Sequence, residues 1–113
     1  MKTIGIVQKL ITMAAVRADN KGNKGTGVAV TKRNGMEVYR VQFEKGGLAA
    51  DTVVLYHYGT PTAEVWLSDT PQLLDVYGES RSDADSVNTF LAQLGIDKRY
   101  TYKPVNGGFQ EVE

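Results

Sequence analysis

The fold is decided by residues 26–43, which read TGVAVTKRNGMEVYRVQF. Two runs that alternate in strand-like fashion, 27–33 and 36–44, flank the dipeptide Asn34-Gly35. Asn-Gly favours a two-residue type I′ turn, because both central residues of that turn need a positive φ. The stretch therefore predicts a β-hairpin.

A two-residue turn fixes the register of this hairpin, and the register decides which side chains share a face. With residue 33 opposite residue 36, apolar side chains of both strands fall on one side of the predicted sheet. The pairs predicted on that side are Val30 with Tyr39, Val28 with Val41, and Thr26 with Phe43. The pairs predicted on the other side are Thr31 with Val38, and Ala29 with Arg40.

The segments on either side of the hairpin have their own periodicities. Before it, apolar residues over 4–18 recur at helical spacing and predict a helix. A strand over 3–7 followed by a shorter helix is the alternative, because a glycine and several β-branched residues weaken the first turn. After it, runs 52–58 and 63–67 have high strand propensity around Gly59-Thr60-Pro61 and predict a second hairpin.

The region after the second hairpin contains the clearest helix. Residues 72–77 fit either a short helix or a strand. Residues 82–94 carry an apolar helical stripe. Ser82 with Asp85 three residues later is a variant of the capping box, and Gly95 suits the C′ position.

A last pair of strand-like runs, 98–103 and 109–112, flanks Asn106-Gly107-Gly108 and predicts a third hairpin. We therefore expect an α+β fold, with an antiparallel sheet of four to six strands built from hairpins and one or two helices packed on one face. The length of 113 residues suits a single domain over 1–113.

The charge composition balances overall but not along the chain. Thirteen Lys and Arg residues match thirteen Asp and Glu residues, which excludes nucleic-acid binding driven by net positive charge. Residues 1–45 hold nine basic against three acidic groups, residues 46–97 one against eight, and residues 98–113 three against two. Such asymmetry either points to an interaction surface or means that the segments neutralise each other across the fold, and pairing between the basic and acidic segments of two copies is also open.

The residue composition excludes several kinds of structural and metal site. The absence of cysteine excludes a disulfide scaffold and a zinc-thiolate site, and it fits a reducing cytoplasm, where we expect the protein. Polar residues interrupt the apolar N-terminal segment, so we expect neither a signal peptide nor a membrane span. The pattern Asp83-x-Asp85-x-x-Asn88 lacks the central glycine and final glutamate of a calcium loop. We expect no metal and no cofactor.

His57 is the one histidine, the residue type that most often serves as acid or base near neutral pH. A catalytic role would need a carboxylate or hydroxyl beside it, for which Asp51, Glu64 and Ser68 are candidates. The alternative is a half-buried sheet histidine that hydrogen-bonds a neighbour. We adopt that alternative and expect no enzyme.

Three motifs in the second half of the chain carry a family resemblance. Residues 56–61 read YHYGTP, Tyr77-Gly78 follows, and residues 80–95 read SRSDADSVNTFLAQLG. They resemble an uncharacterised family of small proteins from phages, plasmids and genomes of lactic-acid bacteria and their relatives. In that family a Tyr-Gly-Thr strand precedes a helix that opens with a Ser/Thr-Asp-Arg-Asp-Ala-Ile-Asn motif, where this chain has Ala84 for Arg and Ser86-Val87 for Ala-Ile. The resemblance implies a mobile element of a Gram-positive host.

The leading functional prediction is an acidic protein-binding face. Its carboxylates fall in or beside predicted turns, where side chains reach solvent: Asp69, Asp75, Glu79, Asp83 and Asp85. We expect a non-catalytic protein, monomer or homodimer, that binds a protein partner through this face. An inhibitor of a host nuclease defence, of the anti-CRISPR kind, is a concrete version, because an acidic face can occupy a basic nucleic-acid channel.

The alternative prediction is a nucleic-acid-binding accessory protein. Its surface would combine basic and aromatic side chains of two hairpins: Lys32, Arg33, Arg40, Arg99, Tyr100 and Tyr102. Tyr100 and Tyr102 share one face of a predicted strand, as a platform for stacked bases requires. Against this, paired tyrosines commonly pack on a core, and the acidic middle of the chain repels phosphate.

Overall fold

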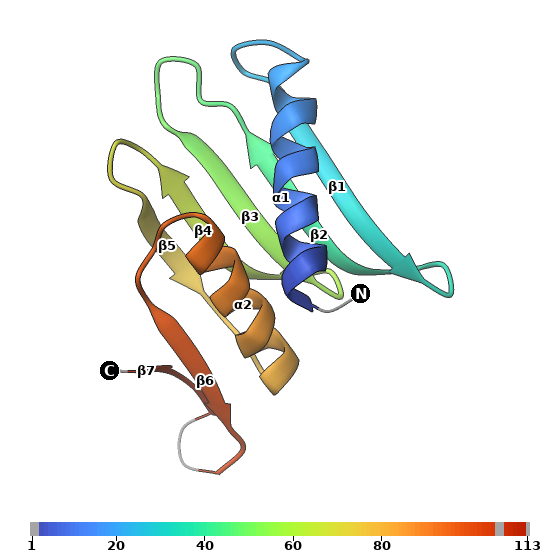
Figure 1. The fold of residues 1–113 in the computed structure, drawn as a ribbon, viewed down its shortest axis with the longest axis vertical. Coiled ribbons are helices and arrows are strands. Elements are labelled where there is room, and N and C mark those ends of the chain that lie inside the picture. Colours follow the sequence, from blue (N-terminus) through green and yellow to red (C-terminus); the bar gives the residue numbers. More distant parts are fainter. Residues whose placement is uncertain (1–2, 106–107, 113) are drawn as a thin grey trace.

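The computed structural model describes residues 3–105 and 108–112 and has an α+β fold (Figure 1). Helix α1 spans Thr3–Asp19. Five strands follow it: β1 (Thr26–Arg33), β2 (Met36–Glu44), β3 (Asp51–His57), β4 (Thr60–Leu67) and β5 (Gln72–Val76). Helix α2 (Arg81–Gln93) precedes the last two strands, β6 (Arg99–Lys103) and β7 (Gly108–Val112).

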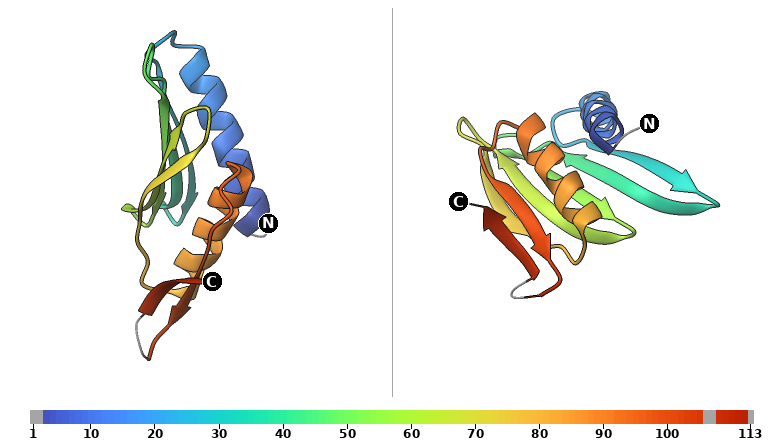
Figure 2. Two further views of the ribbon diagram at one scale, coloured as in Figure 1. Left: turned by 90° about the vertical axis from the view of Figure 1, so that its left-hand side faces the viewer. Right: turned by 60° about the horizontal axis from the view of Figure 1, so that its bottom comes forward.

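The first five strands form one antiparallel sheet in the order β1-β2-β3-β4-β5, and β6 pairs with β7 in a separate antiparallel sheet. Spatial order follows chain order because short connections join each strand to the next. Both helices lie on the same face of the large sheet (Figure 2, left). The predicted fold class is therefore confirmed.

Helix α1 forms as predicted, and the strand-plus-helix alternative is wrong. One stripe of α1 faces the sheet and is buried: Val7, Leu10, Ile11, Ala14 and Ala18. The side chains of this stripe become smaller toward the C-terminal end of the helix, where two alanines follow the larger aliphatic residues. That end of α1 can therefore approach the sheet most closely.

The β1–β2 hairpin has the predicted turn but not the predicted register. Asn34 and Gly35 both have a positive φ, of 53° and 78°, and Arg33 lies opposite Met36. A bulge then leaves Val38 of β2 without a partner on β1. An extra residue in one strand turns the side chains beyond it to the other face.

The bulge brings Gly27 and Ala29, rather than Val28 and Val30, to the face beneath α1. Ala29 is fully buried. A Cβ on Gly27 would lie 2.0 Å from the backbone oxygen of Ala14, so this approach requires glycine. The partners of Tyr39, Val41 and Phe43 are therefore Thr31, Ala29 and Gly27 instead of Val30, Val28 and Thr26.

Strands β3 and β4 form the second predicted hairpin. Its turn is Tyr58-Gly59, whose φ angles of 50° and 81° match a type I′ turn, and Thr60 and Pro61 already belong to β4. The ambiguous segment 72–77 contains strand β5, at one edge of the sheet.

Helix α2 begins one residue before the predicted range of 82–94, and its N-cap lies two residues before the predicted one. Its N-cap is Ser80, whose Oγ accepts a hydrogen bond from the backbone N–H of Asp83 at 3.0 Å. The predicted cap at Ser82 with Asp85 is wrong, because Ser80 and Asp83 have the same spacing and Asp83 also contacts His57 of the sheet. Gly95 follows the helix with a φ of 81°, as expected for C′.

The third hairpin, β6–β7, is confirmed, although Asn106 and Gly107 of its connection lie outside the described residues. The side-chain amide of Asn88 exchanges two hydrogen bonds with the backbone of Tyr100, at 2.7 and 2.8 Å, and fastens β6 to α2. Buried side chains of α1, the large sheet, α2 and β6 form one hydrophobic cluster. Within the described residues, no helix combines the length and hydropathy needed to cross a membrane.

Candidate functional site

The face of the large sheet turned away from both helices carries no further layer of the described chain (Figure 2, left). One row of paired residues, Val28, Gln42, Val54, Glu64 and Asp75, crosses all five strands. Residues of the adjacent row, Ala29, Val41, Leu55 and Ala63, are buried beneath the helices. Because successive side chains of a strand alternate between faces, the first row points away from the helices.

We call this surface the uncovered face. It consists of outward side chains of β1 to β5: Val28, Val30, Arg40, Gln42, Glu44, Val54, Tyr56, Glu64, Trp66 and Asp75. Its apolar side chains are Val54 and Tyr56 on β3, which are half-buried, and Trp66 on β4, which lies opposite Thr52 and is 40% exposed. Exposed apolar side chains on an uncovered sheet face are typical of protein–protein contacts.

The charges on the uncovered face are predominantly negative. Arg40 is neutralised by Glu37, which accepts its hydrogen bonds at 2.7 and 3.0 Å, and the Arg40 guanidinium carbon lies 5.8 Å from the centre of the Tyr56 ring. The bonds from Arg40 lower the pKa of Glu37. Glu64 and Asp75 lie directly opposite each other on β4 and β5, and neither is in an ion pair among the described residues.

The five predicted protein-binding carboxylates are dispersed over the structure. Asp75 lies on the uncovered face, Asp69 in the β4–β5 turn, Glu79 between β5 and α2, and Asp85 on the exposed side of α2. Asp83 turns inward. Sequence reasoning missed Glu64 as the neighbour of Asp75, although alternation along β4 places Glu64 on the other face of the strand from the buried Ala63 and Val65.

The six predicted nucleic-acid-binding residues lie at three separate places. Lys32 and Arg33 line a hollow at the β1–β2 turn, and Arg40 lies on the uncovered face. Arg99, Tyr100 and Tyr102 line a different hollow of about 420 Å³ between α2 and β6, together with Arg81 and Lys103. Tyr100 stacks on Phe109, at 5.2 Å between ring centres, and is buried, which raises the pKa of its phenol. Its ring is therefore covered on the core side rather than open to a base.

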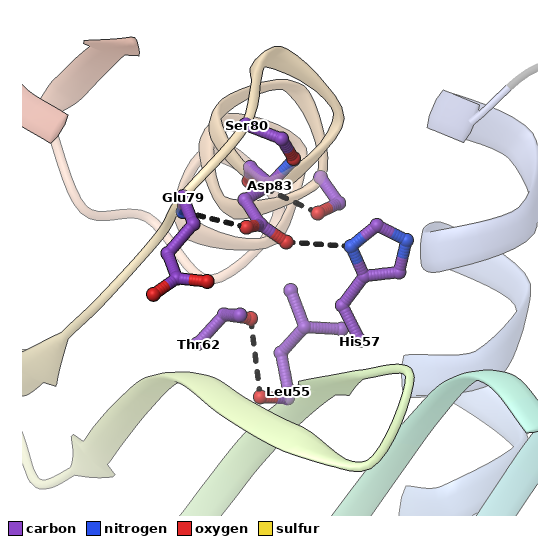
Figure 3. Close-up of polar contacts among 7 residues, drawn as sticks. Leu55, His57, Thr62, Glu79, Ser80 and Asp83 are labelled. Carbon is purple, nitrogen blue, oxygen red and sulfur yellow. Dashed lines mark hydrogen bonds and ion pairs between the residues drawn. The ribbon is translucent and has the colours of Figure 1, made fainter. Parts of the chain in front are cut away.

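His57 lies at the end of β3 on the helix-covered face and is 7% exposed. Its Nδ1 is 2.6 Å from Oδ1 of Asp83 at the start of α2 (Figure 3). The sequence-based partners Asp51, Glu64 and Ser68 are thus wrong. No local pattern identifies the true partner, because it lies 26 residues along the chain and meets His57 only when α2 packs on the sheet.

Asp83 is held from several sides (Figure 3). Its Oδ2 accepts a hydrogen bond from the backbone N–H of Glu79 at 2.7 Å, while Oδ1 faces His57. Burial raises the pKa of Asp83, but the Glu79 N–H and His57 together outweigh burial, so the net pKa is lowered. The carboxylate is therefore a half-buried anion that joins the N-terminus of α2 to β3.

No protein-family model, curated protein or solved structure matches this chain. The resemblance of residues 56–96 to small phage and plasmid proteins therefore stays a prediction. In the part of the chain that the structure describes, no three His, Cys, Asp or Glu side chains gather as metal ligands would.

Proposed function

We propose that this protein acts by binding another protein, and that the uncovered face is the contact surface. The observation that carries the proposal is an apolar sheet face around Trp66 that none of the described chain covers and whose unpaired charges are carboxylates. Apolar burial at the centre of such a contact supplies affinity, and charge at its rim selects the partner.

The opposed carboxylates Glu64 and Asp75 support a binding role. Like charges directly opposite each other on neighbouring strands destabilise a sheet. The charges of the pair therefore do not stabilise the sheet, whereas they add negative potential beside Trp66.

The partner that fits this surface presents an apolar patch edged by lysine and arginine. A nuclease with a basic nucleic-acid channel is a partner of this class, and the resemblance to mobile-element proteins favours a host nuclease. Occupation of such a channel would block nucleic acid without any chemistry by this chain. The protein would then act as a non-catalytic inhibitor.

Site-specific photocrosslinking tests the surface. A photoreactive benzoylphenylalanine replaces Trp66 in one sample and Val16, which is 53% exposed on α1, in the control. Both are irradiated in lysate of a lactic-acid bacterium. We expect an adduct with a basic protein at position 66 and none at position 16. Equal adducts at both positions, or an adduct with an acidic protein only, would contradict the proposal.

Matched charge variants test the partner class, with a purified RNA-guided nuclease as the probe. The double variant Glu64→Gln/Asp75→Asn should inhibit DNA cleavage at least about tenfold less well than the wild type. The control Asp69→Asn/Asp85→Asn removes the same charge away from the uncovered face and should inhibit normally. Inhibition that is absent, or equally reduced in both variants, would exclude this class of partner at this face.

Two other outcomes assign the uncovered face differently. A salt-sensitive affinity for single- or double-stranded nucleic acid would favour the accessory-protein alternative. A homodimer that Trp66→Ser dissociates, and Val16→Ser does not, would mean that a second copy covers this face. Analytical ultracentrifugation at two protein concentrations distinguishes that case.

A further inference from the structure

A second candidate site lies on the helix-covered side of the sheet, away from the uncovered face. It is a hollow of about 320 Å³ where the β1–β2 turn, the β3–β4 turn and the start of α2 meet. His57 is among the residues that line it, with aromatic side chains of Tyr39 and Tyr58 and basic side chains of Lys32 and Arg33.

The His57 imidazole has one edge left for a ligand. Its two neighbouring rings are Tyr39, at 4.5 Å between centres and nearly parallel, and Tyr58, at 4.6 Å. Nδ1 is taken by Asp83, and the second ring nitrogen lies on the far side of the ring (Figure 3). Among the described residues, Nε2 has no hydrogen-bond partner. Every polar side-chain atom of these residues that lacks a partner keeps some exposure to solvent. Nε2 is therefore accessible to a small ligand.

The charge around this hollow is positive. Lys32 and Arg33 line it, and no carboxylate does. Glu37 lies opposite Lys32 on β2, but both of its carboxylate oxygens accept hydrogen bonds from Arg40. Asp83 and Glu79 line a neighbouring hollow that shares His57, Tyr58 and Ser82 with this one. Asp83 is moreover occupied by the imidazole and by a backbone N–H.

We propose that this hollow binds a phosphate group, either free or carried by a small ester. An arginine guanidinium donates parallel hydrogen bonds to phosphate oxygens, and a lysine ammonium adds a mobile positive charge. The His57 Nε2 donates to a P–O⁻ oxygen when the ring is protonated and accepts from a P–OH group when it is neutral. The hydroxyl of Ser82, which also lines the hollow, is a further donor.

The single histidine makes the test direct. Long-range ¹H–¹⁵N spectra of the ¹⁵N-labelled protein show only one imidazole, which is followed while inorganic phosphate or phenyl phosphate is added at constant ionic strength. We expect a saturable change in the Nε2 signal. Saturation by both probes assigns the site to phosphate itself, and saturation by phenyl phosphate alone assigns it to an ester.

Matched charge variants complete the test. Lys32→Ala/Arg33→Ala should weaken the affinity at least about tenfold, since it removes both cations of the hollow. Lys21→Ala/Lys24→Ala removes equal charge from the loop before β1 and should change the affinity less than about twofold. His57 is kept, because it also joins β3 to α2. No saturable change with either probe, or equal losses in both variants, would overturn the proposal.

The phosphate site and the protein-binding proposal fail independently. The hollow lies on the side of the helices, and none of its lining residues belongs to the uncovered face. Loss of phosphate binding in Lys32→Ala/Arg33→Ala therefore leaves crosslinking from position 66 unchanged, and Trp66→Ser leaves the Nε2 response unchanged.

Discussion

Adjacent residues of one strand lie in opposite environments on the two faces of the large sheet. Leu55 of β3 is fully buried beneath the helices, while Val54, its neighbour, is half-buried on the uncovered face. On the covered face Nδ1 of His57 is paired with the carboxylate of Asp83. On the uncovered face Glu64 and Asp75 oppose each other. The covered face is thus built for stability, whereas the uncovered face keeps features that folding does not require.

The largest expected difference between the faces comes from truncating those adjacent residues. Leu55→Ala should lower the free energy of unfolding by about 2–5 kcal/mol, because it leaves a cavity in the core. Val54→Ala should cost less than about 1 kcal/mol, because less apolar surface is lost from a half-buried site. Urea denaturation measures both. Equal losses would show that a second layer covers the outer face in solution.

A smaller effect is expected from the close approach of α1 to β1. Gly27→Ala should destabilise the protein by about 1–3 kcal/mol, because the new Cβ would lie 2.0 Å from a backbone oxygen of Ala14. Val28→Ala, one residue further on the uncovered face, should cost less than about 1 kcal/mol. Thermal denaturation compares the two. A tolerated Gly27→Ala would contradict the observed packing of α1.

The buried pair on the covered face should make stability depend on pH. Since the pKa of Asp83 is lower in the folded than in the unfolded protein, its contribution is complete above the unfolded value of about 3.8. That contribution is lost as the pH falls through the folded pKa. Asp83→Asn should therefore cost about 1.5 kcal/mol at pH 7, and the gap to the wild type should narrow below pH 4.

Urea titrations at pH 7 and pH 3 measure this gap. Asp85→Asn is the control, because Asp85 lies on the exposed side of the same helix. A gap for Asp83→Asn that stays constant with pH would show that its carboxylate does not hold α2 to the sheet.

The smallest expected effect is a gain on the uncovered face. Glu64→Gln should raise the free energy of unfolding by about 0.5 kcal/mol, because it removes the repulsion from Asp75. The gain should shrink in 1 M NaCl, which screens exposed charges. Asp69→Asn, in the β4–β5 turn, should show no such gain. A loss of stability in Glu64→Gln would mean that Glu64 makes a stabilising contact. It would weaken the proposal that Glu64 and Asp75 serve partner binding.

Local sequence patterns predicted the elements well but their faces poorly. The Asn34-Gly35 turn and the apolar stripe of α1 could be predicted from the sequence, because both depend on residues within a few positions of each other. The bulge at Val38 was not, since nothing in the alternation of β1 and β2 marks it. The cap of α2 was ambiguous for a related reason: Ser80 and Ser82 each precede an aspartate by three residues.

The candidate sites were harder still to predict from the sequence. Asp83 was assigned to a solvent-facing acidic set, and only the packing of α2 on the sheet brings it to His57. The hollow beside His57 joins Lys32 and Arg33 of one hairpin to the turn of another. Glu64 and Asp75 become neighbours through the register of β4 and β5.

The sequence by itself determined the fold class, the Asn34-Gly35 turn and the two helices, because each follows from short-range periodicity and backbone preferences. Only the tertiary structure decided which side of each strand is covered and which charges meet. A single bulge inverts the faces of β1, and the docking of α1 requires glycine and alanine there rather than valine. Those requirements come from contacts between residues far apart in the chain, and no local pattern contains them.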